Sequence, residues 1–137
     1  MEALTVDVFV PADRAAVRAA FLDADQLARW WWSFLPDVTC SMDPRPGGSY
    51  RMRCDAAGFG VHGKVLTVDD ATAVVSWVWE DGSTDGPEET VTIRFADADS
   101  GTQVVVTHMC AARADELRQG WTDTLAELPK LFAQPAC

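Results

Sequence analysis

The sequence predicts an α+β domain in which a curved antiparallel sheet of about six to seven strands wraps around a long C-terminal helix. Strand-like runs follow one another through the middle of the chain with short turns between them, which favours antiparallel pairing. Near the C-terminus the apolar spacing changes to the three- and four-residue steps of a helix. Packing the helices on the concave side of one sheet is the natural solution for this order of elements.

The chain begins with a strand and two short helices. Apolar and polar residues alternate over residues 4–10, and Pro11 ends this strand. Asp13 is a suitable cap for a first helix over residues 13–22. A second short helix is expected between Asp23 and Trp31, because Asp23-Ala-Asp25 can restart a helix.

Six further strands and the long helix complete the predicted fold. The strands are expected at residues 38–42, 50–54, 61–68, 74–80, 89–95 and 102–109. The helix carries an apolar stripe made of Leu117, Trp121, Leu125, Leu128 and Phe132. Pro129 removes a backbone hydrogen bond to residue 125, so a kink is expected there.

Length and composition point to one globular domain over residues 1–137. Of the 137 residues, 48% are hydrophobic and 23% are charged, which is a globular balance. The net charge of -10 disfavours nucleic acid and anionic membrane surfaces as partners. No apolar run approaches the roughly 20 residues of a membrane span, and the N-terminus lacks the features of a signal peptide. A cytoplasmic location is the default expectation.

The four cysteines are expected to be reduced thiols, because no Cys-x-x-Cys pair is present and a chain of this size needs no disulfides. Cys40, Cys54 and Cys110 lie in strand-like apolar contexts and are read as core residues. Cys137 lies in the tail, where it can oxidise between molecules.

Three elements together resemble a known family. They are the stretch from Phe21 to Trp31 with its Trp-Trp pair, the stretch from Met42 to Arg51 with Arg-Pro-Gly-Gly, and Gly120-Trp121 in the last helix. With these three elements aligned, nearly the whole chain is similar to the heat-shock-protein-90 ATPase activator homologue-like proteins of the START-like, helix-grip superfamily. The resemblance implies a helix-grip fold with a cavity for lipids, polyketides or similar molecules, and it implies no particular reaction.

The shared motifs also have a structural interpretation. Gly47 and Gly48 suit a tight turn with a positive φ, and Gly120 would relieve a close contact between helix and sheet. Trp30 and Trp31 are expected to cover one end of the core. No catalytic residues are carried over from the family.

The six tryptophans supply most of the candidate ligand-binding surface. Side chains that strand or helix periodicity places on the inner face would line a wide apolar slot. The predicted ligand-binding residues are Tyr50, Met52, Trp77, Trp79, His108, Trp121 and Leu125. The alternative is that the same side chains only fill a core.

His108 is the candidate catalytic residue, because it shares strand parity with Val104 and Val106 and should point inward. A hydrogen-bonded core histidine is the competing interpretation. His62 can face either side. His108 and Cys110 alternate on one strand but have no further ligand at a recognisable spacing, so neither a metal site nor a cofactor is expected.

Asp7 and Glu80 are the acidic residues nearest to candidate positions, with Glu80 at a strand end where a pocket could open. Solvated surface is the expected fate of both carboxylates. Arg51 and Arg53 should point outward and pair with acidic residues.

The leading functional hypothesis is a protein that binds a small hydrophobic or aromatic molecule as carrier, sensor or resistance protein. The first alternative is a polyketide cyclase, dehydratase or hydrolase that uses the same cavity, with His108 moving protons near Tyr50, Glu80 or Asp7. The second alternative is a chaperone-accessory or other protein-binding module. A homodimer is possible under each hypothesis.

Overall fold

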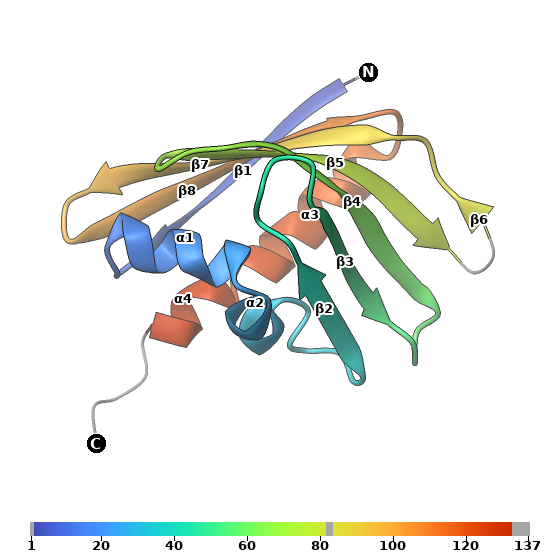
Figure 1. Ribbon diagram of the computed structural model, residues 1–137, viewed down its shortest axis with the longest axis horizontal. Coiled ribbons are helices and arrows are strands. Elements are labelled where there is room, and N and C mark those ends of the chain that lie inside the picture. The colour runs from blue at the N-terminus through green and yellow to red at the C-terminus, as the bar shows by residue number, and fades with distance from the viewer. Residues whose placement is uncertain (1, 82–83, 133–137) are drawn as a thin grey trace.

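An antiparallel sheet forms one layer of the structure and the helices form the other (Figure 1). The computed structural model describes residues 2–81 and 84–132. The strands are β1 (Glu2–Val10), β2 (Val38–Met42), β3 (Ser49–Cys54), β4 (Phe59–Val68), β5 (Thr72–Asp81), β6 (Thr84–Asp85), β7 (Glu89–Ala98) and β8 (Gly101–Cys110). The helices are α1 (Arg14–Leu22), α2 (Ala24–Trp30), α3 (Ala114–Leu125) and α4 (Leu128–Phe132).

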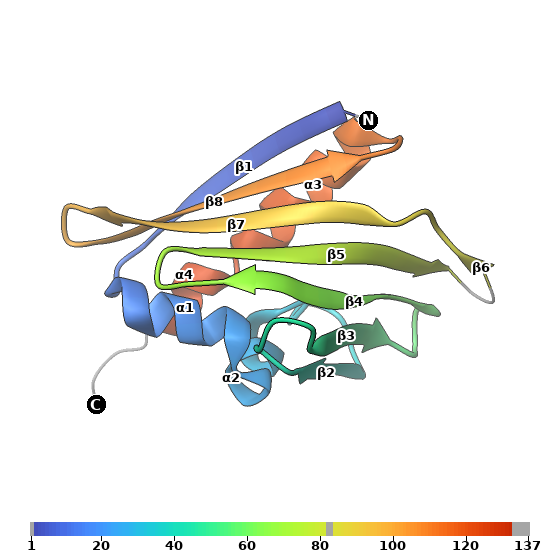
Figure 2. The same cartoon turned by 45° about the horizontal axis from the view of Figure 1, so that its top comes forward.

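The strand order of the sheet is β1-β8-β7-β5-β4-β3-β2, and the short β6 pairs with β5 (Figure 2). The first strand, β1, thus pairs with the last strand, β8, over Glu2 to Val10, and β1 and β2 form the two edges of the sheet. All pairings are antiparallel, as the short links predict. The register shifts once, between Val65 and Thr67 of β4. The predicted curved sheet and helix-grip fold are confirmed.

Two aspartates define the ends of the N-terminal helices. The side chain of Asp13 accepts a hydrogen bond from the Ala16 backbone N–H at 2.9 Å, so α1 begins one residue later than expected. Asp23 serves both helices: its backbone N–H donates to the Ala19 carbonyl, and its carboxylate accepts from the Asp25 N–H. Capping of this kind is typically worth about 1 kcal/mol.

The predicted long C-terminal helix is broken rather than kinked. α3 ends at Leu125, and a turn at Ala126 and Glu127 separates it from α4. Pro129 has no N–H to donate to the residue 125 carbonyl, which accounts for the end of the regular hydrogen bonding there. The predicted apolar stripe still faces the core on both helices.

The core lies between the concave face of the sheet and the helices. Tyr50 and Met52 are each 3% exposed, which confirms that their shared strand parity points inward. Cys54 and Cys110 are buried free thiols that donate to main-chain carbonyls, whereas Cys137 lies outside the described residues. Burial raises the pKa of the partly buried Cys40 thiol to about 11, so this thiol stays protonated near neutral pH.

The turn before β3 depends on two glycines, as predicted, but only Gly47 has the predicted positive φ. Gly47 has a φ of 85°, a conformation that only glycine adopts readily. A Cβ on Gly48 would lie 2.3 Å from the Asp43 carbonyl oxygen. Neither position accepts another side chain without strain.

No helix in residues 2–81 and 84–132 combines the length and the apolar character that crossing a bilayer requires.

Candidate functional site

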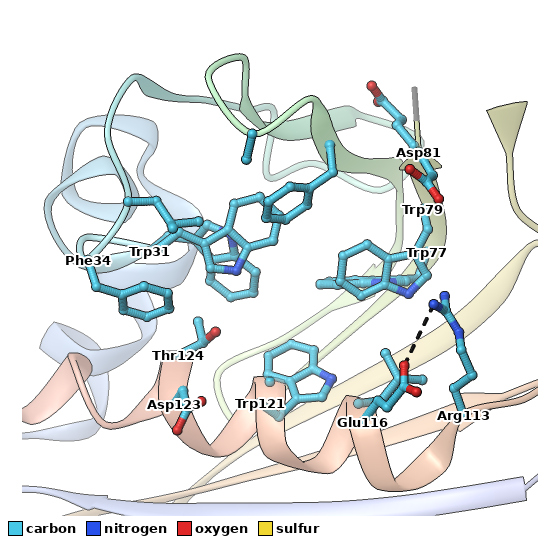
Figure 3. Close-up of a pocket in the computed structure, with 17 residues that line it drawn as sticks. Trp31, Phe34, Trp77, Trp79, Asp81, Arg113, Glu116, Trp121, Asp123 and Thr124 are labelled. Carbon is cyan, nitrogen blue, oxygen red and sulfur yellow. Dashed lines mark ion pairs between the residues drawn. The ribbon is translucent and has the colours of Figure 1, made fainter. Parts of the chain in front are cut away.

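A pocket of about 520 Å³ opens between α3, the segment after α2 and the end of β5. Figure 3 shows its tryptophans facing one another above α3, with Phe34 toward one end and Arg113 toward the other. The described residues that line it are Trp31, Trp32, Phe34, Leu35, Ala57, Phe59, Trp77, Trp79, Glu80, Asp81, Arg113, Glu116, Leu117, Gly120, Trp121, Asp123 and Thr124. Its volume lies within the range of about 300–1,000 Å³ that is typical of small-molecule sites.

Five of the six tryptophans belong to this lining. The ring of Trp121 on α3 lies 5.2 Å from that of Trp77 on β5 and 5.5 Å from that of Trp31, measured between centroids. Trp79 extends the surface from Trp77 at 5.4 Å. These edge-to-face and tilted arrangements hold the rings in fixed positions and leave a wide aromatic wall.

Two pocket residues adopt the left-handed backbone conformation. Trp32 has a φ of 49° and Arg113 has a φ of 61°. This region is unfavourable for a bulky residue, and strained positions of this kind cluster at functional sites. Trp32 directly follows Trp31, and Arg113 directly precedes α3, so each lies where the chain turns around the pocket.

The mouth of the pocket carries more negative than positive charge. Asp81, Glu116 and Asp123 are exposed carboxylate residues of the lining. Arg113 is the one cationic side chain among the described lining residues, and its guanidinium lies 3.8 Å from the Glu116 carboxylate (Figure 3). The entrance therefore favours an uncharged molecule over an anion.

Gly120 does not have the role that the sequence predicted. A Cβ at this position would meet no atom within 4 Å, and the residue lines the pocket. It therefore relieves no contact between α3 and the sheet, and the missing side chain keeps part of the pocket open. Glycine in a helix interior costs about 1 kcal/mol relative to alanine. The residue that leaves this space open therefore destabilises α3.

His108 lies in a buried hydrogen-bonded chain. Its Nε2 is 2.7 Å from the Glu89 carboxylate, and its Nδ1 accepts from the indole N–H of Trp121 at 3.0 Å. A second oxygen of Glu89 accepts from the Ala111 N–H at 2.8 Å. Burial lowers the pKa of His108, although the Glu89 hydrogen bond opposes that shift. The arrangement fits a neutral ring with its proton on Nε2.

Glu80 is buried rather than solvated, which differs from the expectation. Arg51 holds its carboxylate with two hydrogen bonds at 3.0 and 2.7 Å, and Arg53 and His62 each add one. The Arg51 guanidinium is the main cause that lowers the pKa of Glu80 to about 2. Asp7 remains on the surface, where it accepts from Gln103.

The predicted ligand-binding residues fall into two groups. Trp77, Trp79 and Trp121 line the pocket. The other four, Tyr50, Met52, His108 and Leu125, are buried core residues outside its described lining. Tyr50 donates its hydroxyl hydrogen to the Ser76 carbonyl at 2.6 Å, and burial raises its pKa above the ordinary value.

Sequence reasoning missed Trp32, Phe34 and Glu89. Trp32 and Phe34 lie in the irregular segment after α2, where no periodicity predicts which way a side chain points. Glu89 had a usable signal, because it shares strand parity with the inward Val91 and Ile93. No three His, Cys, Asp or Glu residues gather as a metal centre would require in the part of the chain that the structure describes.

Three buried indole N–H groups of the pocket residues have no hydrogen-bond partner among the described residues. They belong to Trp31, Trp77 and Trp79. By contrast, the N–H groups of Trp30 and Trp121 donate to the Ala20 carbonyl and to His108. Unpaired buried donors are uncommon and call for an explanation.

Solved structures of low sequence identity share this fold over nearly the whole chain. DynU16, a protein in the dynemicin biosynthetic locus, is 23% identical with a TM-score of 0.80, and the match covers 96% of this chain and 47% of DynU16. CV1439 from Chromobacterium violaceum is 22% identical with a TM-score of 0.79, covering 97% and 98%. CalU16 from Micromonospora echinospora is 20% identical with a TM-score of 0.73, covering 96% and 76%.

This chain thus spans about half the length of DynU16, and identities at this level show the fold alone. No curated protein matches the sequence significantly. The family model for Activator of Hsp90 ATPase homolog 1-like protein matches residues 11–133. With the curved sheet, the helices on its concave face and this match, the chain belongs to the Activator of Hsp90 ATPase homolog 1-like family, within the START-like, helix-grip proteins.

Proposed function

We propose that the protein binds a small, largely apolar aromatic molecule in the tryptophan-lined pocket and acts as a carrier, sensor or resistance protein. The observation that carries the proposal is a pocket of about 520 Å³ with five tryptophans in its lining. The aromatic part of the lining offers a planar ligand a large apolar contact surface. A fold match to DynU16, a protein of the dynemicin biosynthetic locus, supports a ligand of natural-product type.

The surroundings of His108 favour binding over catalysis by this residue. Both ring nitrogens are already engaged, by Glu89 and by Trp121, and the side chain is fully buried. A general base must come within about 3 Å of the proton that it removes. His108 is not among the described residues that line the pocket, so it holds Trp121 in place rather than meeting a ligand there.

Gly120 offers a direct test of the pocket. Replacing it by leucine fills open space without a steric clash at the Cβ position and gives α3 a better helix former. We expect Gly120→Leu to weaken ligand binding by about tenfold or more, the loss that follows from roughly 1.4 kcal/mol of excluded contact. The variant should fold at least as stably as the wild type.

The measurement is native mass spectrometry of freshly purified protein, followed by tryptophan-fluorescence titration with aromatic polyketides and fatty acids. Thr122→Leu is the matched control, because Thr122 is an exposed position of the same helix outside the described pocket lining. Equal affinity in Gly120→Leu and Thr122→Leu would place the ligand elsewhere. Absence of any retained or titratable ligand would contradict the proposal and favour a protein-partner role.

A further inference from the structure

The described lining of the pocket offers a ligand few hydrogen-bond donors. Three of its indole N–H groups are buried out of reach of solvent, namely those of Trp31, Trp77 and Trp79. The N–H of Trp121 is already bonded to His108. Arg113 is the one cationic side chain of the described lining, and its guanidinium lies beside the Glu116 carboxylate. A ligand that needs donors or a positive charge from the protein therefore finds little here.

Carboxylates, in contrast, surround the opening. Asp81, Glu116 and Asp123 are exposed residues of the lining, and we call them the rim carboxylates. Figure 3 shows Asp81 beyond Trp79, and the other two along α3. The net charge of -10 on the whole chain acts in the same direction. A cleft that carries charge of one sign raises the local concentration of molecules of the opposite charge.

A buried hydroxyl group in the pocket also lacks a partner. Thr124 is 3% exposed, and Figure 3 shows its side chain on the pocket side of α3, between Phe34 and Trp121. Thr122 on the same helix donates its hydroxyl hydrogen to the Arg118 carbonyl at 2.7 Å, whereas no described residue bonds to the Thr124 hydroxyl. Unlike the three indole N–H groups, this hydroxyl is not closed off from solvent. It can therefore accept a hydrogen bond from a ligand.

Trp79 offers the tryptophan ring that a ligand reaches best. The other four tryptophans of the lining are at most 5% exposed, whereas Trp79 is only half-buried near the end of β5. Asp81 follows two residues later on the same strand and pairs with Phe59 across the sheet. Indole is the best cation–π partner among the aromatic side chains. A positive charge against Trp79 would therefore lie near a carboxylate as well.

We infer that the ligand is a flat aromatic cation whose positive charge lies against Trp79 near Asp81, and which donates an N–H to the Thr124 hydroxyl. This inference rests on the proposed binding function and specifies the chemical class of its ligand. A neutral hydrocarbon would gain the apolar contacts but would leave the rim carboxylates and the hydroxyl unused. An anion would be repelled at the opening.

N-methylacridinium and the methylanthracene with its methyl group on the central ring test the charge, because they differ only in carbon replacing the charged nitrogen. We expect wild-type protein to bind N-methylacridinium about tenfold more tightly. Hydrophobic burial alone would favour the uncharged compound. Tryptophan-fluorescence titration measures both affinities, and the preference for the cation should shrink as salt screens the rim carboxylates.

Two aspartate variants locate the charge. Asp81→Asn removes one rim carboxylate with little change of shape, so the affinity for N-methylacridinium should fall by about threefold while that for methylanthracene stays the same. Asp70→Asn is the matched control, because Asp70 is an exposed residue in the turn at the opposite end of β5, outside the described pocket lining. Both variants change the net charge equally, and only Asp81→Asn should weaken binding of the cation.

A second pair of variants tests the hydroxyl. Proflavine is a flat cation of the same ring system that carries N–H groups, which N-methylacridinium lacks. Thr124→Val removes the hydroxyl and keeps the shape, so proflavine should lose about fivefold in affinity and N-methylacridinium should lose none. Thr122→Val, on the exposed side of the same helix, should leave both affinities unchanged. The two pairs of variants are independent, so each decides its own contact even if a protein of the other pair fails to fold.

Equal binding of N-methylacridinium and methylanthracene, or tighter binding of methylanthracene, would overturn the inference and leave the proposed binding function standing. Equal losses in Asp81→Asn and Asp70→Asn would show that the cation responds to the charge of the whole chain, and would overturn the position assigned to it. An unchanged affinity for proflavine in Thr124→Val would overturn the contact with the hydroxyl. Binding of none of these compounds would contradict the aromatic pocket itself, and the inference would fall with it.

Discussion

The indole N–H of Trp121 donates to Nδ1 of His108 over 3.0 Å, and this contact fixes the orientation of a pocket wall. Glu89 accepts from Nε2 on the other side of the ring, so the histidine proton is held away from Trp121. Of the three residues only Trp121 belongs to the described lining of the pocket. His108 and Glu89 therefore hold the Trp121 side chain in position from outside the pocket.

Two substitutions of His108 should separate the contribution of its hydrogen bonds to stability from the contribution of its packing. A glutamine can donate to Glu89 and accept from Trp121, so His108→Gln is expected to cost at most about 1–2 kcal/mol of unfolding free energy. His108→Leu leaves one oxygen of the buried Glu89 carboxylate and the indole N–H of Trp121 without partners, and is expected to cost about 3–5 kcal/mol. Urea unfolding monitored by circular dichroism gives both values.

Comparable losses in the two variants would show that the Glu89–His108–Trp121 chain contributes little beyond packing. Ligand binding offers a second readout, because a glutamine that holds Trp121 in place should preserve affinity. A protonation role in catalysis would instead require turnover that His108→Gln abolishes.

Acidification should weaken the hydrogen bonds that link Glu89, His108 and Trp121. Burial lowers the pKa of His108 below its ordinary value of 6.5, so the unfolded chain binds this proton more readily than the folded one. The stabilisation from a neutral His108 is thus complete above pH 6.5 and is lost as pH falls from there through the lowered folded pKa. Protonation would also place a hydrogen on Nδ1, which then cannot accept from Trp121.

The check is unfolding free energy measured from about pH 7.5 to 5 for the wild type and His108→Gln, a range that brackets the ordinary histidine pKa. Wild-type stability should fall more steeply over this range than that of the variant. All other titratable groups are present in both proteins, so the difference between the two curves reports His108. Parallel curves would contradict a neutral, hydrogen-bonded His108.

Glu80 should affect the pH dependence of the unfolding free energy at lower pH than His108 does. Its pKa is lowered from 4.5 to about 2, chiefly by Arg51, so its contribution to stability is complete above pH 4.5 and is lost as pH falls toward 2. Because the carboxylate is buried and accepts four hydrogen bonds, Glu80→Gln is expected to cost about 2–3 kcal/mol near neutral pH. The deficit should shrink on acidification.

Asp43→Asn is the matched control for Glu80→Gln. Asp43 also accepts two hydrogen bonds from the side chain of one arginine, Arg45, but that pair lies on the surface with the Arg45 side chain 82% exposed. Exposed pairs of this kind contribute little to stability. Thermal unfolding of both variants should therefore show a clear loss only for Glu80→Gln, and equal losses would contradict the importance of burial.

Most of the fold could be predicted because local patterns report it. Val38–Met42 forms a strand with the predicted bounds, since Pro36 and the following proline-glycine turn enclose a short strand-forming run. Strand parity also placed Trp77 and Trp79 on one face. The break after Leu125 was foreseen only as a kink, because a missing hydrogen bond does not tell how the chain continues.

The site could be predicted only in part, because its geometry depends on contacts between distant segments. The partner of His108 is Glu89 on the neighbouring strand β7, and this pairing follows from the register of β7 with β8. Trp32 reaches the pocket through a left-handed backbone in an irregular segment, for which the sequence gives no signal. Gly120 illustrates the same limit, since a glycine alone does not show whether it faces a neighbour or open space.

Two glycines with opposite surroundings give a final prediction about the sheet behind the pocket. A Cβ on Gly63 of β4 would lie 2.0 Å from the backbone oxygen of Ser76 and 2.9 Å from the ring of Tyr50. The same Ser76 oxygen accepts the Tyr50 hydroxyl hydrogen at 2.6 Å, so the tyrosine covers the glycine and ties β3 to β5. The space that a methyl group needs is already filled.

We therefore expect Gly63→Ala to lower the unfolding free energy by about 3 kcal/mol or more, because backbone and ring must both shift. Gly120→Ala, where no atom lies within 4 Å, should raise it by up to about 1 kcal/mol through helix propensity. Both substitutions add one methyl group. The difference between their unfolding free energies in urea therefore reports the effect of the surroundings of each glycine. If Gly63→Ala proved as stable as Gly120→Ala, Tyr50 would not pack across β4, and the core wall formed by β3, β4 and β5 would differ from the one described.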